Sequence, residues 1–216
     1  LLFRQPETLP PESRRSLEPG PVFRAFREVF SHRQVMLYMI ALTCSFATMF
    51  IWLSSIAQIF EDVYGRADEF PLWFALSALM SAPGSLVNAQ LVLKLGMRRL
   101  IVVALIGQIM VVGSALTFYA VTGDLPFWAF FTFMFGHFFA VGLIFGNLNA
   151  LALEPLGHIA GTASSVMGGV STMVSAMIAA PLAALYNGTV LPLMLAVAAC
   201  GVGALLAMTV ARRWDA

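Results

Sequence analysis

Residues 34–60 are QVMLYMIALTCSFATMFIWLSSIAQIF, a stretch without Asp, Glu, Lys or Arg. A helix of about 20 apolar residues crosses the ~30 Å hydrocarbon core of a bilayer. In lipid, a run of this kind satisfies its backbone polar groups as a helix. Five further uncharged runs follow, at residues 71–93, 100–120, 127–152, 160–185 and 190–211. The sequence therefore predicts an all-α membrane protein with six transmembrane helices.

Composition and charge distribution favour the same class of protein. Hydrophobic residues make up 60% of the chain and charged residues 11%, against about 25% charged residues in soluble domains. If six spans alternate from an inner N-terminal segment, every basic residue except Arg66 lies on the inner side. These inner residues are Arg4, Arg14, Arg15, Arg24, Arg27, Arg33, Lys94, Arg98, Arg99, Arg212 and Arg213. The positive-inside rule then predicts that both ends of the chain are cytoplasmic.

The polar segments divide the chain into three parts. Residues 1–33 form a linker whose last part, from residue 21, has the pattern of a short basic amphipathic helix. Residues 34–211 form the six-helix bundle, and residues 212–216 form a cytoplasmic tail. Because the chain begins at Leu1 without Met and with an apolar stub, we interpret it as a piece that lacks upstream sequence.

The six spans divide into two triplets whose middle helices both contain proline. Pro83 and Gly84 lie in the second span, and Pro181 lies in the fifth. Proline removes a backbone hydrogen bond and kinks a helix. Interrupted helices at matching positions are typical of inverted repeats in secondary transporters. We therefore expect a three-plus-three inverted repeat.

The fifth span carries small residues at four-residue intervals, including Gly161, Ser165, Gly168 and Gly169. Rows of small residues let helix backbones approach closely. The pattern is compatible with static helix packing and also with a helix that slides or rocks during transport. We regard these glycines, Ser165 and the prolines as candidate packing or gating residues.

Candidate substrate contacts come from polar side chains inside the spans. Tyr38, Ser45, Thr48 and Trp52 share one face of the first span, which would line a cavity for amphipathic molecules or pack against other helices. In the fourth span His137 is an ionisable group near mid-membrane, which is a functional hypothesis by default. The alternative is a neutral histidine bonded inside the protein. Asn147 lies in the same span and is a further candidate polar contact.

The sequence contains no pattern that indicates an enzyme. It has no nucleotide-binding glycine loop, no acidic metal cluster and no histidine pair at metal-binding spacing. We therefore expect no catalytic residue, no metal site, no bound cofactor and no nucleic-acid partner.

Three short stretches resemble one transporter family. Residues 7–12, ETLPPE, are similar to the start of the central cytoplasmic linker of the Bcr/CflA-type drug-resistance transporters, a group within the major facilitator superfamily. Residues 95–100, LGMRRL, with Gly96, Arg98 and Arg99, resemble that superfamily's short cytoplasmic loop motif, although Leu93 stands where an acidic residue is expected. Residues 159–165, IAGTASS, resemble the start of the eleventh helix in the same drug-efflux group.

This resemblance implies the second half of a twelve-helix, proton-coupled antiporter in a bacterial inner membrane. The spans would be helices seven to twelve, and the first, second, fourth and fifth would line the cavity. The partners would be a missing N-terminal six-helix half, the lipid bilayer and a small amphipathic substrate, with the proton gradient as the energy source. Two alternatives stay open, namely a metabolite importer of the same superfamily and a non-transporting six-span scaffold or subunit.

Overall fold

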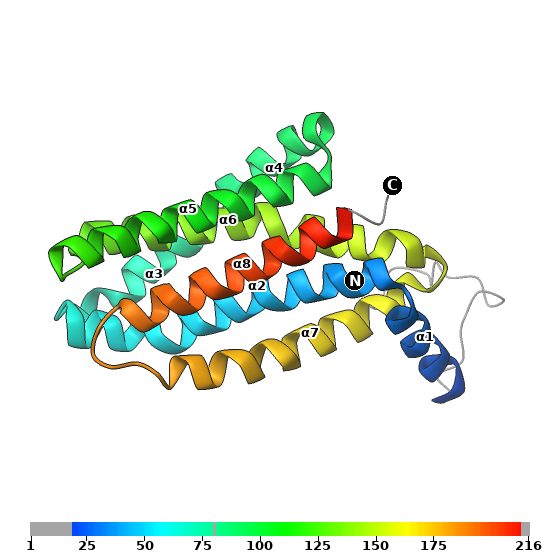
Figure 1. The fold of residues 1–216 in the computed structure, drawn as a ribbon, viewed down its shortest axis with the longest axis horizontal. Helices are drawn as coiled ribbons and strands as arrows, with labels where there is room; N and C mark the ends of the chain where they lie inside the picture. The colour runs from blue at the N-terminus through cyan, green and yellow to red at the C-terminus, as the bar shows by residue number, and fades with distance from the viewer. Residues whose placement is uncertain (1–18, 80, 213–216) are drawn as a thin grey trace, which may run out of the picture.

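The computed structural model describes residues 19–79 and 81–212, and within these ranges every regular element is helical. Most of the long helices run side by side along one axis (Figure 1). The α-helices of the described residues are α1 (Pro19–Ser31), α2 (Arg33–Gln58), α3 (Phe70–Leu79), α4 (Ser81–Leu95), α5 (Met97–Thr122), α6 (Phe127–Leu153), α7 (Ala160–Ala183) and α8 (Leu191–Arg212). The predicted all-α membrane fold is confirmed.

Among the residues that the structure describes, five segments are long and apolar enough to cross a membrane: residues 33–63, 67–95, 97–122, 127–183 and 191–212. The first includes a π-helical turn, Ile59–Val63, after α2. The second includes α3 and α4, on either side of residue 80, where one span was predicted. The fourth contains both α6 and α7, because a 3-10 turn, Glu154–Ile159, joins them without a break. The backbone leaves helical geometry within this turn at Leu156, where φ is −110°, so α6 and α7 are separate helices.

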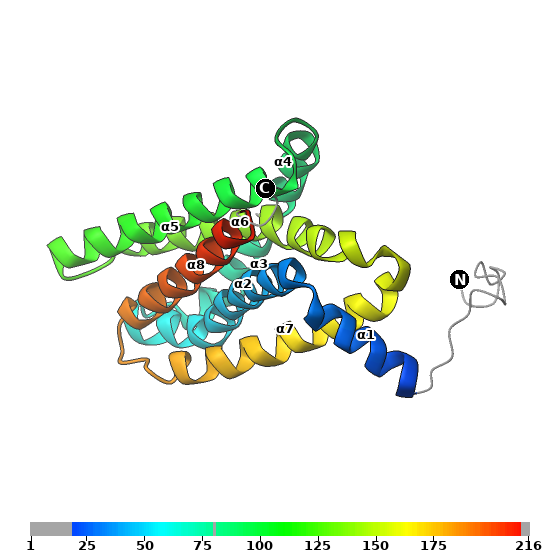
Figure 2. The same cartoon turned by 45° about the vertical axis from the view of Figure 1, so that its right-hand side comes forward.

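The helix contacts follow a crossed pattern between the two triplets. The first triplet is α2, α3–α4 and α5, and the second is α6, α7 and α8. The leading helix of each triplet packs on the middle helix of the other, since α2 contacts α7 and α6 contacts α4. The leading helix of each triplet also packs on the last helix of the other triplet: α2 contacts α8, and α6 contacts α5. Figures 1 and 2 show α2 between α7 and α8. This exchange is what a three-plus-three inverted repeat produces.

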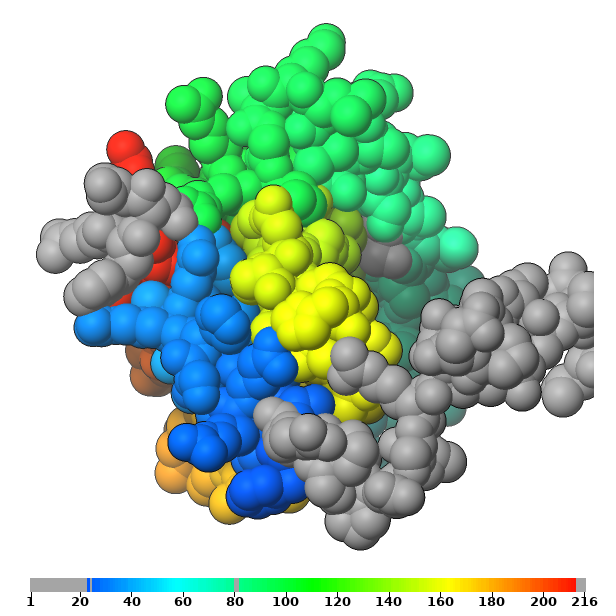
Figure 3. Space-filling view, turned by 90° about the vertical axis from the view of Figure 1, so that its right-hand side faces the viewer, coloured from blue at the N-terminus to red at the C-terminus, as the bar shows by residue number. Residues whose placement is uncertain are grey.

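Helix α1 lies at one end of the bundle, which we call the α1 end. Ala25 and Val29 are buried in the core there, whereas Phe23 is 71% exposed. The Glu28 carboxylate lies 2.7 Å from the imidazole Nε2 of His158, in the turn between α6 and α7. Figure 3 shows α1 beside that turn. The predicted linker before α1 (residues 1–18, including 7–12) and the predicted tail after Arg212 (residues 213–216) lie outside the described residues.

At the end of the bundle opposite α1, tyrosine hydroxyls form hydrogen bonds between the segments that connect the helices. The Tyr64 hydroxyl donates to the carbonyl of Leu125 at 2.8 Å, and the Tyr186 hydroxyl donates to Asp62 Oδ2 at 3.1 Å. Burial and the hydrogen bond and charge of Asp62 raise the pKa of Tyr186 to about 12. Burial, together with the charge of Asp124, also raises the pKa of Tyr64. Both phenols are therefore neutral hydrogen-bond donors at physiological pH.

Candidate functional site

The predicted polar face of the first span lies inside the bundle. Tyr38, Ser45, Thr48 and Trp52 are all buried on α2. The Ser45 hydroxyl donates to the Ala41 carbonyl at 2.9 Å, and the Thr48 hydroxyl donates to the Ser45 carbonyl at 2.7 Å. Both hydroxyls are thus satisfied within their own helix. Whether any of these four side chains contacts a transported molecule stays a prediction.

Trp52 and His137 form the centre of an aromatic cluster between α2 and α6. Trp52 has no exposed surface, and its ring centroid lies 4.8 Å from that of Phe133 and 5.6 Å from those of Phe130 and His137. The amide of Gln108, on α5, lies 2.9 Å from His137 Nδ1. If the amide donates this bond, the proton of the neutral imidazole lies on Nε2.

Two N–H groups in this cluster have no acceptor among the described residues. They are Trp52 Nε1 and His137 Nε2, and both are buried. A buried donor without an acceptor costs about 1–3 kcal/mol, and such groups are rare in native structures. An acceptor oxygen placed beside either nitrogen would remove that cost. Both side chains are buried inside this chain, whereas Leu53 on α2 is 43% exposed, so a contact between the cluster and a transported molecule stays a prediction.

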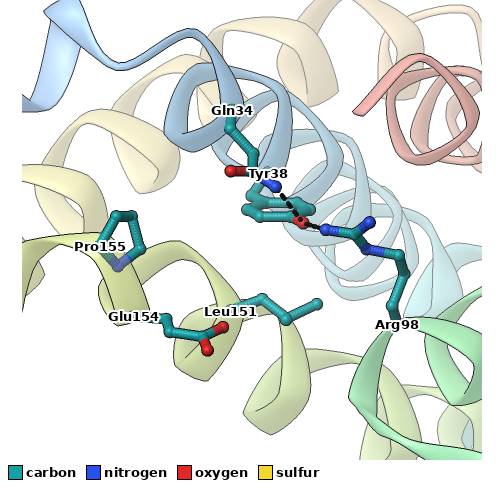
Figure 4. Close-up of a pocket in the computed structure, with 6 residues that line it drawn as sticks. All are labelled: Gln34, Tyr38, Arg98, Leu151, Glu154 and Pro155. Carbon is teal, nitrogen blue, oxygen red and sulfur yellow. Dashed lines mark hydrogen bonds between the residues drawn. The ribbon is translucent and has the colours of Figure 1, made fainter. Parts of the chain in front are cut away.

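A second polar group lies near the α1 end, where two separately predicted sets of residues meet. Gln34 Nε2 donates to the Tyr38 hydroxyl at 3.2 Å, and Arg98 donates to the same oxygen. The Arg98 guanidinium carbon lies 5.7 Å from the Tyr38 ring centroid. Figure 4 shows this arrangement around a cavity of about 460 Å³ that is also lined by Leu151, Glu154 and Pro155. Tyr38, which was predicted to line a substrate cavity, and Arg98, which was predicted as part of the loop motif, thus form one contact between α2 and α5.

The rest of the predicted loop motif shapes the turn between α4 and α5. Gly96 has φ of +77°, a left-handed conformation that glycine adopts without a steric cost. It precedes the first residue of α5, Met97, and Arg99 is exposed in the first turn of that helix. Gly96 therefore allows a sharp reversal that leaves Arg98 and Arg99 at the end of the bundle.

Asn147 lies in the contact between α6 and α4. Its side-chain amide donates to Asn88 Oδ1 and, at 2.7 Å, to the carbonyl of Leu143. One turn before Asn88, Gly84 lies so close to α6 that an added Cβ would be 2.5 Å from the Phe139 carbonyl oxygen. The residues predicted as a substrate contact and as a packing position therefore belong to the same helix contact. Pro83, next to Gly84, is exposed.

The small-residue rows of α7 point away from the chain's own bundle. Gly161, Ser165, Gly169 and Pro181 are exposed and Gly168 is half-buried. A Cβ added to any of these three glycines would meet nothing within 4 Å. The buried side of α7 is a different row, made of Ala163, Met167, Ser171, Ser175 and Ala179. Neither the packing nor the gating hypothesis has a partner helix for these rows among the described residues.

The predicted site residues leave out four residues that complete these contacts. Two of them, Gln108 and Asn88, are amides inside apolar spans, for which the sequence indicates hydrogen bonding between helices rather than a substrate contact. Gln34 also had a signal, because it lies four residues before Tyr38 in the same helix, a spacing at which side chains meet. Gly142, whose Cα would lie 3.4 Å from a Cβ on Gly84, had none, because its role depends on the neighbouring helix. Among residues 19–79 and 81–212, no group of three or more His, Cys, Asp or Glu side chains could hold a metal ion.

Uncharged helical spans in two crossed triplets define a multi-pass membrane protein with the architecture of a secondary transporter. The chain belongs to the Major Facilitator Superfamily, whose family model matches residues 1–181. This is a family of transporters and not of enzymes.

Two curated relatives cover most of the chain. It is 30% identical over 211 residues to a bicyclomycin resistance protein homolog from Haemophilus influenzae, a match that covers 96% of this chain and 52% of the relative. It is 23% identical over 194 residues to the uncharacterized MFS-type transporter YdgK from Bacillus subtilis, covering 89% and 48%. The chain therefore spans about half the length of the curated relatives it matches. No solved structure matches it.

Proposed function

We propose that this chain is the C-terminal half of a proton-coupled secondary transporter that exports drugs or other amphipathic small molecules by alternating access. The observation that carries the proposal is the match of 96% of the chain to about half of a relative named for bicyclomycin resistance. The location we propose is a bacterial inner membrane with both ends of the chain cytoplasmic, in accordance with the positive-inside rule.

The uncovered faces of α2 and α7 support a cavity shared with a second half. Leu53 is 43% exposed on α2, and Ser54 and Ala57 beside it are exposed. On α7, the glycine and serine rows are exposed in the same way. In a membrane protein, small residues permit close helix approach, so this face suits a second helical bundle that rocks against it.

The composition of the spans supports an uncharged or amphipathic substrate. The six predicted spans contain no Asp, Glu, Lys or Arg, and a carboxylate substrate would favour a buried basic residue. Aromatic side chains in the spans offer apolar area, and tryptophan and tyrosine add a polar handle, which suits an amphipathic ligand. We infer that the carboxylates that carry protons belong to the other half.

Drug susceptibility in an efflux-deficient bacterial host tests this proposal. The whole reading frame and this 216-residue piece would be expressed side by side, with immunoblots of the membrane fraction to confirm equal amounts. We expect only the full-length protein to raise resistance, and a protonophore to abolish the resistance in efflux assays. If both proteins reach the membrane and neither changes the susceptibility to any compound, drug export is wrong. Resistance that survives collapse of the proton gradient would contradict proton coupling.

A further inference from the structure

A separate cavity lies at the α1 end, between the start of α5 and the end of α8. Its volume is about 400 Å³, and its lining includes Arg98, Arg99, Val102, Val103, Met208 and Arg212. It is distinct from the cavity around Tyr38, although Arg98 lines both. The described residues around it thus combine three guanidinium groups with an apolar wall.

The described residues that line this cavity carry charge of one sign. None of them is acidic, so the described lining adds three positive charges and no negative one. Arg99 and Arg212 are exposed, and Arg98 donates to the Tyr38 hydroxyl. Guanidinium groups match phosphate oxygens in geometry and charge. The rim of the cavity is therefore complementary to a phosphate group.

The apolar wall continues along the same two helices. On α5, Val103 is 59% exposed, Ile106 43% and Met110 68%. On α8, Leu206 is 59% exposed and Val202 43%. In a bilayer, exposed apolar residues of a spanning helix contact acyl chains. Each helix therefore carries exposed apolar side chains on the stretch that leads from the basic rim toward mid-membrane.

We propose that the cavity between α5 and α8 binds an anionic phospholipid, whose phosphate contacts Arg99 and Arg212 and whose acyl chain lies against Val103. Basic pockets between transmembrane helices are suited to anionic headgroups. The position of the two arginines along the helices agrees with contact to a lipid headgroup, because Arg99 is in the first turn of α5 and Arg212 ends α8. Since Arg98 also contacts Tyr38, a bound lipid would adjoin the contact between α5 and the central helix α2.

Lipid binding to the purified full-length protein tests this site. The protein would be placed in nanodiscs of phosphatidylcholine alone or with equimolar phosphatidylglycerol, and phosphatidylglycerol retained after delipidation would be counted by native mass spectrometry. Each basic residue near a membrane surface contributes about 1 kcal/mol to anionic-lipid attraction. We therefore expect the double variant Arg99→Gln/Arg212→Gln to bind phosphatidylglycerol roughly thirty-fold more weakly.

Two further variants separate a built site from general attraction. Lys94→Gln removes an exposed basic residue near the same end that does not line the cavity, and we expect it to retain the lipid. Val103→Trp fills the apolar wall without changing charge, and we expect it to lose the lipid. The proposal is overturned if Lys94→Gln weakens retention as much as the double variant does, if Val103→Trp retains the lipid, or if inorganic phosphate displaces it. Because the readout is lipid retention, its outcome is independent of whether the protein exports drugs.

Discussion

The glycines in this chain differ in how much space surrounds them. Gly84 faces the backbone of α6 so closely that a methyl group has no room, whereas Gly107, Gly161 and Gly169 have nothing within 4 Å of an added Cβ. Gly84 therefore permits a close contact between two helices of this chain, whereas none of the described helices of this chain lies close to the glycines on the outer face of α7.

Replacing Gly84 with alanine should destabilise the protein. The new Cβ would lie 2.5 Å from a backbone oxygen, which cannot move away as the end of a flexible side chain would. Overpacking of this kind costs about 1–3 kcal/mol, so we expect a lower midpoint of thermal unfolding for the purified protein in detergent. Gly107→Ala, also in a helix but in open space, is the control and should be neutral or stabilising. A Gly84→Ala protein as stable as its parent would show that α4 does not lie this close to α6.

The buried nitrogens of Trp52 and His137 are the other feature at the residue scale. Each is a donor without an acceptor among the described residues, in a cluster where the remaining neighbours are mainly phenylalanine rings. Burying a polar group without a hydrogen bond costs free energy. Because Trp52 and His137 are buried inside this chain whereas Ser54 of α2 is exposed, their contact with a substrate stays a prediction.

At the scale of elements, the contact between α2 and α7 and the contact between α4 and α6 contain different hydrogen-bonding groups. Between α7 and α2, the Ser175 hydroxyl donates to the Thr43 carbonyl at 2.8 Å. Between α4 and α6, Asn147 donates to Asn88, one turn from the close approach at Gly84. Helices in lipid gain little from apolar contact with each other, so hydrogen bonds and close packing determine their association.

A double-mutant cycle on Asn88 and Asn147 measures the α4–α6 contact. We expect Asn88→Ala and Asn147→Ala each to lower stability, with a coupling between them of about 0.6 kcal/mol and at most about 1.7 kcal/mol, the average and maximum for hydrogen bonds between membrane helices. The unfolding free energy in mixed micelles is the quantity to measure. Asn149, whose amide bonds only the Phe145 carbonyl of its own helix among the described contacts, supplies the control cycle with Asn88. Equal coupling in both cycles would mean that Asn88 and Asn147 do not interact directly.

At the scale of the whole molecule, the outer surface has two kinds of exposed face. One includes Ser54 of α2, which we assign to the cavity shared with the other half. The other includes Val103 of α5, which we assign to lipid. Burial within this chain does not distinguish them, because both residues are exposed.

Cysteine labelling distinguishes these faces in the full-length protein. With Cys44 and Cys200 replaced by alanine, we expect Ser54→Cys to react several-fold faster with a membrane-impermeant maleimide than Val103→Cys does, because only the cavity is filled with water. A lipid-soluble maleimide should reverse or remove this difference. Faster labelling of Val103→Cys by the impermeant reagent would show that the assignment of faces is wrong.

The sequence determined that this protein is an all-helical, multi-pass member of its superfamily. That was possible because a bilayer acts on each apolar run separately, so length and lack of charge are sufficient to predict a spanning helix. Only the tertiary structure decided which side of the less polar helices lies inside: it turns the Gly161 row outward, and it brings Tyr38 to Arg98 across 60 positions of sequence. The physical reason is that lipid and protein interior are both apolar, so hydrophobic periodicity does not mark the inner face of a membrane helix.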